Sequence, residues 1–203
     1  MLITVDAVNR TREHAVLRSM FEARKRVFID LLKWDIPALA DRFEIDQFDD
    51  IHAHYLIVTD TAGAHLASAR LLPTTRPALL DGLYLDLCDG PVPSGEAIFE
   101  ITRFCLSPGI GAERRRIARD TLLVALAEFA IANDLTTFTG VAELPWFRQI
   151  CTFGWDCRAL GETRLHAGRA LVGLAIEIDE TTVSKLAAAG IVGERAAFAA
   201  AAA

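Results

Sequence analysis

The spacing of hydrophobic residues predicts alternating helices and strands along most of the chain. Apolar side chains recur every three or four residues, the period of a helix buried on one side, in segments 12–33, 113–133 and 181–189, and a short helix is expected around 144–153. Shorter apolar runs rich in β-branched and aromatic residues predict strands over residues 54–59, 65–72, 97–106, 135–141, 155–160 and 170–178. Helices and strands therefore share the core of this protein.

Polar and irregular stretches separate these segments. Residues 35–50 are acidic and contain Pro37, and a connection of this length inside a compact domain is usually functional or mobile. Residues 60–63 (Asp-Thr-Ala-Gly) predict a hairpin turn between the first two strands. The alanine-rich tail, residues 196–203, is expected to be frayed or disordered.

The order of the elements predicts an α/β fold. A helix, a hairpin, a strand, a helix and further strands fit a mixed, mostly antiparallel central sheet flanked by helices, in three α/β/α layers. Segments 97–106, 113–133 and 135–141 form a β-α-β unit within it. The length of 203 residues fits a single domain over residues 1–195, followed by the tail.

Composition and charge narrow the function classes. Hydrophobic residues make up 52% and charged residues 24% of the chain, as in ordinary globular proteins. A net charge of −6 argues against nucleic acid as the main partner, because a phosphate-binding surface normally shows a basic excess. No apolar run approaches the length needed to span a membrane, and no signal peptide is evident, so a cytoplasmic protein is expected. The scattered cysteines form no C-x-x-C pair, so no metal site is expected.

Two charged residues lie inside the apolar run 97–106. Burying Glu100 and Arg103 costs several kcal/mol unless each is paired or hydrogen-bonded, so they form either a structural ion pair or part of a reaction cleft. Side chains alternate along a regular strand, so these two should point to opposite faces. They can face one cleft only if an extra residue interrupts the pairing, and we predict a β-bulge or a splay of the strands between Phe99 and Phe104.

Four short motifs between residues 20 and 106 resemble one known family in order and spacing. They are RKRVF at 24–28 followed by Trp34, EIDQFD at 44–49, RLLPT at 70–74 and EITRF at 100–104. Together they resemble the acyl-homoserine-lactone synthases of the LuxI type, which make quorum-sensing autoinducers. The second half of the chain, around Gly154 and Trp155, resembles the family only loosely.

The resemblance implies a reaction and its partners. The amine of S-adenosylmethionine attacks the thioester of an acyl chain on acyl carrier protein, and the substrate's carboxylate then displaces methylthioadenosine to close a lactone. S-adenosylmethionine is thus a substrate, and no cofactor is expected. The family fold is similar to that of GCN5-type N-acetyltransferases.

The resemblance also implies roles for named residues. Glu100 and Arg103 are the candidate catalytic residues, with Glu100 as the base that deprotonates the amine. The candidate S-adenosylmethionine site consists of Arg24, Phe28, Trp34, Asp46, Asp49 and Arg70. Among them, the guanidinium of Arg24 can pair with a carboxylate, and the rings of Phe28 and Trp34 can stack on adenine or face the sulfonium. The two aspartates could contact the ribose, the amine or Arg70.

The acyl donor is expected to bind at a turn and helix start beyond the 97–106 strand. The candidate residues for phosphopantetheine and acyl carrier protein are Gly109, Gly111, Arg114, Arg115, Arg116 and Arg119. An acidic carrier would offset the unfavourable placement of arginines near a helix N-terminus, although a merely solvated face is the alternative. Leu106 stands where acetyltransferases carry a basic residue, which disfavours coenzyme A. The candidate acyl pocket consists of Phe99, Phe104, Thr139 and Trp146.

Two other functions fit the same fold. The chain could be a different N-acyltransferase that uses acyl-coenzyme A, or a catalytically silent member that binds acyl carrier protein. The intact block from Arg24 to Trp34 argues against the first, and the intact Glu100 argues against the second. The sequence does not give the acyl length, the substitution at its third carbon or the oligomeric state.

Overall fold

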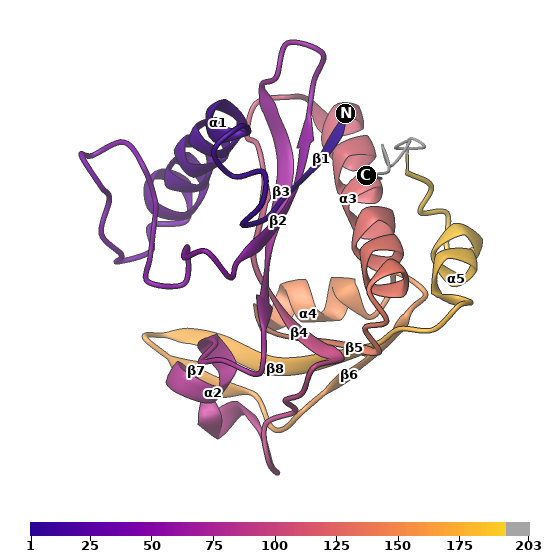
Figure 1. Cartoon of the computed structure of the whole chain (residues 1–203). Coiled ribbons are helices and arrows are strands. Elements are labelled where there is room, and N and C mark those ends of the chain that lie inside the picture. Colours follow the sequence, from indigo (N-terminus) through magenta and orange to yellow (C-terminus); the bar gives the residue numbers. More distant parts are fainter. Residues whose placement is uncertain (194–203) are drawn as a thin grey trace. The chain divides into compact units, whose positions relative to one another are not determined.

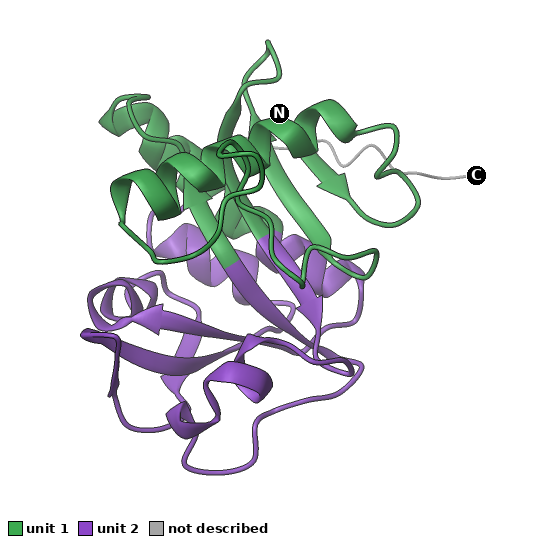
Figure 2. Cartoon of the chain, turned by 90° about the vertical axis from the view of Figure 1, so that its left-hand side faces the viewer, with its two compact units in different colours: residues 1–69, 103–125, 192–203 green, residues 70–102, 126–191 purple. Residues whose placement is uncertain are grey.

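The structure, a computed structural model, describes residues 1–193 of the chain. These residues divide into two compact units, which Figure 2 colours separately. Of the described residues, unit 1 contains 1–69, 103–125 and 192–193, and unit 2 contains 70–102 and 126–191. The tail expected at 196–203 lies outside the described residues.

Eight strands form one mixed sheet. They are β1 (Leu2–Val5), β2 (His54–Thr59), β3 (His65–Pro73), β4 (Ile98–Leu106), β5 (Thr137–Glu143), β6 (Asp156–Ala159), β7 (Arg164–His166) and β8 (Arg169–Glu177). Their order is β1-β2-β3-β4-β5-β8-β6, and β7 also pairs with β8. Strands β4 and β5 are parallel, whereas the pairs β1–β2, β5–β8, β6–β8 and β7–β8 are antiparallel. The predicted mixed sheet is confirmed.

The helices are mostly short. They are α1 (His14–Arg24), α2 (Leu79–Leu83), α3 (Ala112–Ala132), α4 (Leu144–Ile150) and α5 (Thr182–Ala188), with a π-helix η1 (Lys25–Leu31) and a 3₁₀ turn η2 (Leu85–Leu87). The helix predicted over 12–33 is therefore an α-helix that widens into a π-helix. Such widening is uncommon and often marks functional sites, and here it begins immediately after Arg24.

The sequence pattern predicted six strands to within about two residues but missed three elements. Strands β1 and β7 span four and three residues, too few for an alternating pattern to show. Helix α2 lies in a proline-punctuated segment and contains Gly82, so no helical period is visible there. The hairpin predicted between the first two strands is confirmed, because Gly63 N–H donates to the carbonyl of Asp60 at 3.1 Å.

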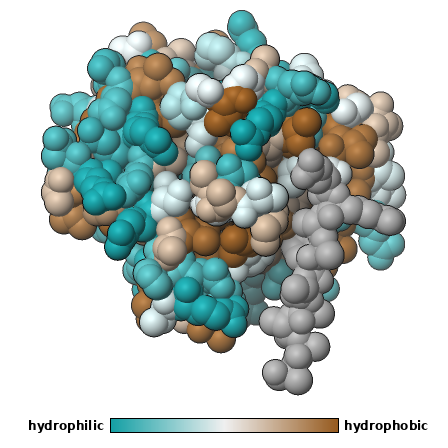
Figure 3. All heavy atoms as spheres, turned by 90° about the horizontal axis from the view of Figure 1, so that it is seen from above, coloured by the Kyte–Doolittle hydropathy of each residue, from teal (hydrophilic) through white to brown (hydrophobic). Residues whose placement is uncertain are grey.

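Unit 1 buries apolar residues on both sides of its strands, with α1 on one side of β1–β3 and the start of α3 on the other (Figure 1). Helix α1 places Met20 and Ala23 in the interior, and β2 contributes Leu56 and Ile57. No helix of the described chain is both long enough and apolar enough to cross a bilayer. The face shown in Figure 3 mixes hydrophilic and hydrophobic residues without one large apolar patch.

Unit 2 is built on the β5–β8 pair, with α2 on one side and α4 on the other (Figure 1). Segment α2–η2 packs closely on β8 because position 173 is glycine. A Cβ atom at Gly173 would lie 2.9 Å from the carbonyl oxygen of Leu87. Leu80 and Leu87 bury their side chains at this contact, together with Leu171 of β8. This packing fixes the turn that carries Ala78 and Asp81.

Strand β4 contains the predicted bulge. Arg103 has a φ of 52°, a left-handed conformation that side chains rarely adopt within a strand. Buried positions alternate at Glu100 and Thr102 and then shift by one residue to Cys105. The backbone hydrogen bonds on the two sides of Arg103 also differ in register by one residue. On one side the N–H of Thr74 donates to Ile98, and on the other the N–H of Ser107 donates to Leu66. The bulge prediction is confirmed, and Arg103 is the inserted residue.

Candidate active site

Unit 1 contains a buried network of charged side chains around Arg24. Nη1 and Nη2 of Arg24 donate to the two oxygens of Asp49 at 2.8 and 2.9 Å, and Nε donates to Glu44. The side chains of all three residues are 1% exposed. Burial alone would lower the pKa of Arg24, but the hydrogen bonds and charges of Asp49 and Glu44 raise it instead. Arg24 is therefore a fully paired cation.

The same network reaches the bulge in β4. Arg103 donates from Nη2 to Glu44 at 3.0 Å and to Asp46 at 2.7 Å. Glu44 thus accepts from two arginines and joins the helix, the acidic loop and the strand of unit 1. The predicted alternative of a Glu100–Arg103 ion pair is wrong, because the hydrogen bonds of Arg103 go to Glu44 and Asp46. The left-handed backbone at Arg103 gives its side chain this direction.

The acidic loop is held in place by its own aspartates. Asp49 accepts from the hydroxyl of Tyr55 at 2.9 Å and from the backbone N–H of Asp46 at 2.9 Å, in addition to Arg24. Asp46 accepts from the backbone N–H of Phe48. Arg24 is completely surrounded by protein apart from about 1% of its side-chain surface. A direct bond from Arg24 to a substrate carboxylate, as expected from the sequence, would require it to leave Asp49 or Glu44.

An aromatic pair lies beside this network. The rings of Phe28 and Trp34 are stacked with their centroids 4.6 Å apart. The guanidinium carbon of Arg103 lies 5.7 Å from the Phe28 centroid and 5.6 Å from that of Trp34. The guanidinium of Arg103 thus faces the two rings. The sequence analysis expected the sulfonium of a substrate in such a position. The structure therefore brings together, within unit 1, Arg24, Phe28, Trp34, Asp46, Asp49 and Arg103.

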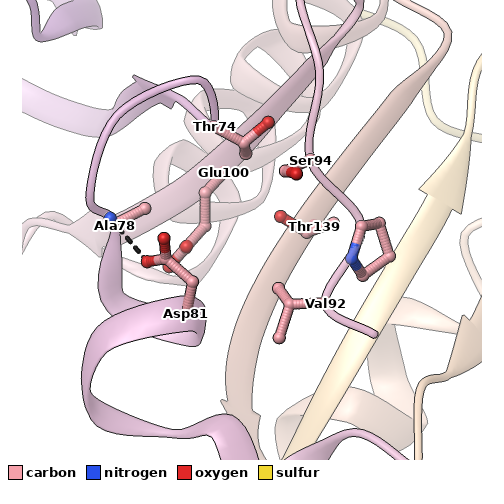
Figure 4. Close-up of a pocket in the computed structure, with 8 residues that line it drawn as sticks. Thr74, Ala78, Asp81, Val92, Ser94, Glu100 and Thr139 are labelled. Atoms are coloured by element: carbon pink, nitrogen blue, oxygen red, sulfur yellow. Dashed lines mark hydrogen bonds between the residues drawn. The ribbon is translucent and has the colours of Figure 1, made fainter. Parts of the chain in front are cut away.

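Unit 2 contains a pocket around Glu100. It is a small pocket lined by Thr74, Ala78, Asp81, Val92, Pro93, Ser94, Glu100 and Thr139 (Figure 4). Glu100 of β4 and Thr139 of β5 are register partners on neighbouring parallel strands. Adjacent positions of this kind present their side chains on the same face of the sheet. Figure 4 shows both side chains directed into the pocket, together with Asp81 from α2.

Two buried polar atoms in this pocket have no hydrogen-bond partner. Glu100 accepts from the backbone N–H of Leu80 to Oε2 at 3.1 Å, and the N–H of Leu79 also acts on this carboxylate, while Oε1 has no partner within hydrogen-bond geometry. The hydroxyl of Thr139 also has none. Both residues are 1% exposed. Such unsatisfied groups are rare in folded proteins and require an explanation, for which a substrate or a bound water is the natural candidate.

Burial gives Glu100 the protonation behaviour of a general base. The pKa of Glu100 is raised to about 7, mainly by burial and to a smaller extent by the charge of Asp81, while the N–H bond from Leu80 lowers it. The charge of Arg70 opposes the shift. Arg70 is itself buried, and its Nε donates to the hydroxyl of Thr102 at 2.9 Å. A carboxylate whose pKa lies near neutrality can accept a proton and release it again.

A family comparison identifies the chain. A sequence model of the family described as "Autoinducer synthase" matches residues 9–186, which include the charge network and the Glu100 pocket. The chain belongs to the autoinducer synthase family. An acyl-homoserine-lactone synthase of Ralstonia nicotianae (strain ATCC BAA-1114 / GMI1000) is 32% identical over 183 residues, covering 87% of this chain and 89% of that protein. One from Rhizobium etli is 30% identical, covering 85% and 82%. This autoinducer synthase is accordingly an acyltransferase.

Solved structures agree with this assignment. A CoA-dependent acyl-homoserine lactone synthase, MesI, superposes with a TM-score of 0.84 at 28% identity and covers 96% of this chain and 97% of that one. TofI in a ternary complex with an inhibitor and MTA gives 0.78 at 27% identity, covering 92% and 96%. An acyl-CoA N-acyltransferase from Pseudomonas aeruginosa gives 0.60 at 19% identity, which shows the shared fold alone. The fold expected for the autoinducer synthase is confirmed.

The turn before α3 has the backbone conformation that its glycines allow. Gly109 and Gly111 have φ values of 76° and 80°, and both lie immediately before the 21-residue helix α3. Arg115 donates from Nη1 to the carbonyls of Leu106 and Ser107, both at 3.0 Å, and so ties the helix to the end of β4. Arg115 therefore has a structural role in the autoinducer synthase.

The other arginines of α3 are partly neutralised within the protein. Arg119 contacts the buried carboxylate of Asp120 at 2.6 Å, and Arg116 lies 3.6 Å from it. Arg114 lies 3.5 Å from Asp60. The side chains of Arg114 and Arg116 remain 56% and 59% exposed. Both side chains are therefore accessible to a partner of the synthase.

The acyl-pocket residues predicted from the sequence are found in different surroundings. Thr139 lines the Glu100 pocket, whereas the lining does not include Phe99, Phe104 or Trp146. The ring of Phe99 lies 6.5 Å from that of Phe129, and Trp146 makes an edge contact with Phe153 at 5.8 Å. An acyl-binding role of these aromatic residues remains a prediction. The described residues contain no cluster of His, Cys, Asp or Glu suited to a metal.

Sequence reasoning missed two polar residues of the network and one of the pocket. Glu44 opens the motif EIDQFD but was not predicted as a site residue, although it bridges both arginines of the network. Tyr55 lies in β2, and the sequence pattern indicates only a strand residue there. Asp81 lies in the unpredicted helix α2, so no pattern could have associated it with Glu100.

Proposed function

We propose that this synthase makes an N-acyl-homoserine lactone from S-adenosylmethionine and an acyl thioester. The unpaired, buried Oε1 atom of Glu100 is the observation that supports the proposal most strongly. A carboxylate in such a site can take a proton from the amine of S-adenosylmethionine, directly or through one water. The structures of TofI with MTA and of BjaI with SAM and isopentyl-CoA contain ligands of this chemistry.

The acylation step follows from a deprotonated amine. The amine nitrogen attacks the thioester carbonyl, so that a C–N bond forms, the C–S bond breaks and the carrier thiol leaves. Glu100 accepts the amine proton, and this proton is passed to the departing thiolate, so that the carrier is released as the thiol. Backbone N–H groups beside the Arg103 bulge are candidates to stabilise the oxyanion of the tetrahedral intermediate.

The lactonisation step needs mainly correct folding of the substrate. A carboxylate oxygen of the acylated intermediate attacks its own γ-carbon, a C–O bond forms, and the C–S bond to the sulfonium breaks. The electron pair stays on sulfur, and neutral methylthioadenosine leaves. Holding the reacting atoms in contact is worth about 7–11 kcal/mol at best. We assign substrate positioning to the aromatic pair Phe28–Trp34 and to the loop that Arg24 and Arg103 anchor.

We assign acyl carrier protein as the donor, with acyl-coenzyme A as the alternative. The carrier is acidic, and Arg114 and Arg116 offer exposed positive charge near the glycine turn that would receive the phosphopantetheine phosphate. The alternative is favoured by MesI, which is CoA-dependent and 28% identical to this chain. Leu106 supplies no positive charge for the pyrophosphate of coenzyme A.

The proposal is tested with purified enzyme, S-adenosylmethionine and a series of acyl donors on either carrier. We expect mass spectrometry to detect equimolar lactone and methylthioadenosine. Neither product with any donor, from a folded enzyme, would contradict the proposed function.

The carrier is tested with the double reversal Arg114→Glu and Arg116→Glu. We expect KM for acyl carrier protein to rise at least about tenfold, while KM for S-adenosylmethionine stays unchanged. A higher kcat/KM with acyl-coenzyme A, together with an unchanged carrier KM in the double variant, would assign coenzyme A instead.

A further inference from the structure

A second carboxylate lines the Glu100 pocket, and no step described above uses it. Asp81 of α2 and Glu100 of β4 both face this space (Figure 4). Asp81 is exposed at the residue level, whereas Glu100 is buried. The pocket also contains the two buried oxygen atoms without partners, on Glu100 and Thr139. The pocket therefore combines an inner acid, an outer acid and unsatisfied atoms that call for a ligand.

One short stretch of backbone holds both carboxylates. The N–H of Ala78 donates to Oδ1 of Asp81 at 2.7 Å, and the N–H of Leu80 donates to Oε2 of Glu100 at 3.1 Å. Because both donors belong to the same turn, the position of Asp81 relative to Glu100 is fixed by local backbone structure. The close packing of Leu87 on Gly173 of β8 also stabilises this turn.

Two charged groups act on Glu100 from the elements around it, Asp81 on α2 and Arg70 on β3. The thiol of Cys88, after η2, in turn experiences the charge of Glu100. Burial is the main reason that the pKa of Glu100 is raised, the charge of Asp81 adds to the effect, and that of Arg70 opposes it. Burial, Asp89 and Glu100 also raise the pKa of Cys88, so its thiol is neutral near pH 7. Asp81 is thus the nearby negative charge that disfavours ionised Glu100.

We propose that Asp81 is a positioning residue for the acylation step, which acts through Glu100 and makes it a stronger base. A negative charge beside a buried carboxylate increases its affinity for a proton. A base of higher proton affinity removes the amine proton more readily, provided that it is still ionised at the working pH. This inference rests on the proposed role of Glu100 and adds the residue that tunes it.

The test measures the protonation of Glu100 directly and in catalysis. The carboxyl carbon of Glu100, assigned with Glu100→Gln, is titrated by ¹³C NMR in the wild type, in Asp81→Asn and in Asp81→Glu. Asparagine keeps an oxygen for the N–H of Ala78 but removes the charge. Asp86→Asn is the matched control, since it removes one negative charge from the same segment outside the pocket lining. Methylthioadenosine release is followed from pH 5.5 to 8.5 in the same proteins.

We expect Asp81→Asn to move the Glu100 midpoint and the acid limb of kcat/KM together toward lower pH, by about half a unit or more. Asp81→Glu and Asp86→Asn should leave both near the wild-type position. A lower rate in Asp81→Asn with an unmoved midpoint would overturn the inference and leave Asp81 a purely structural role. The NMR midpoint is independent of turnover, so absence of product would reject the proposed function without deciding the role of Asp81.

Discussion

Arg24 in unit 1 and Glu100 in unit 2 are both buried, but with opposite hydrogen bonding. In unit 1, the buried guanidinium of Arg24 is bonded to Asp49 and Glu44, and that of Arg103 is bonded to Glu44 and Asp46. In unit 2, Glu100 is buried with a backbone N–H bond from Leu80 and one oxygen without a partner. A charge bonded to oppositely charged side chains holds structure in place, whereas a buried group with an unmade bond retains its capacity to react. The comparison thus distinguishes residues of the sequence motifs that hold the structure, such as Arg24, from a residue that is available for chemistry, Glu100.

The largest stability effect is expected from breaking the paired region. Arg24→Ala leaves Asp49 and Glu44 buried without their main cation and should lower the free energy of unfolding by about 3–5 kcal/mol. Urea denaturation at pH 7 measures this loss. Arg12→Ala is the control, because Arg12 forms an exposed pair with Glu13 and should change stability by less than about 1 kcal/mol. Equal stabilities of the two variants would show that the buried network contributes no more than a surface pair.

Replacing Glu100 should raise the free energy of unfolding, whereas replacing Arg24 lowers it. Glu100 has a pKa of about 7 in the folded protein and an ordinary value of 4.5. The folded state therefore binds the proton more tightly, and the wild type loses stability as the pH rises from about 4.5 to 7. Glu100→Gln removes this loss, so it should be more stable than the wild type at pH 8 by up to about 3 kcal/mol. Near pH 5 the two proteins should differ little in unfolding free energy.

That pH dependence is measured by urea denaturation of both proteins at pH 5 and pH 8. Glu100→Asp serves as a control, because it keeps an ionisable carboxyl group in the pocket. If the stability difference between wild type and Glu100→Gln is the same at both pH values, burial does not raise the pKa of Glu100 in the folded protein.

Removing a paired hydroxyl provides a smaller test. Tyr55→Phe deletes the O–H that donates to Asp49 and should cost about 1.5 kcal/mol or more of unfolding free energy, since the bond is to a charged group. A double-mutant cycle with Asp49→Asn isolates the pairwise contribution. Additive effects of the two changes would refute a direct Tyr55–Asp49 bond in solution.

Removing the hydroxyl of Thr139, which has no hydrogen-bond partner, is the counterpart of removing the bonded hydroxyl of Tyr55. Thr139→Val deletes a buried O–H without a partner and should leave the stability unchanged or raise it by up to about 1 kcal/mol. Chemical denaturation beside Tyr55→Phe under identical conditions compares the two hydroxyls. A loss above 1 kcal/mol would mean that the Thr139 hydroxyl is bonded in the resting enzyme.

The sequence predicted the strand and bulge of this site but not the partners of its charges. Two charged residues three positions apart in an apolar strand implied an insertion, and the left-handed Arg103 confirms it. The bonds of Arg24 to Asp49 and Glu44 join residues 25 and 20 positions apart and depend on how the acidic loop packs. Local periodicity carries no information about such packing, so Arg24 was expected to meet a substrate. Helix α2, and with it Asp81, was missed because its turn is fixed by Gly173 on another strand.

The central claim is that Glu100 reacts because one of its oxygens is buried without a partner. The most direct test compares the wild type and Glu100→Gln at pH 8 with saturating S-adenosylmethionine and acyl donor, measuring lactone and methylthioadenosine by mass spectrometry. We expect kcat to fall by about 10²–10⁴-fold in the variant, in a protein that is folded and at least as stable as the wild type. A folded Glu100→Gln enzyme that forms lactone within twofold of the wild-type rate would contradict the claim.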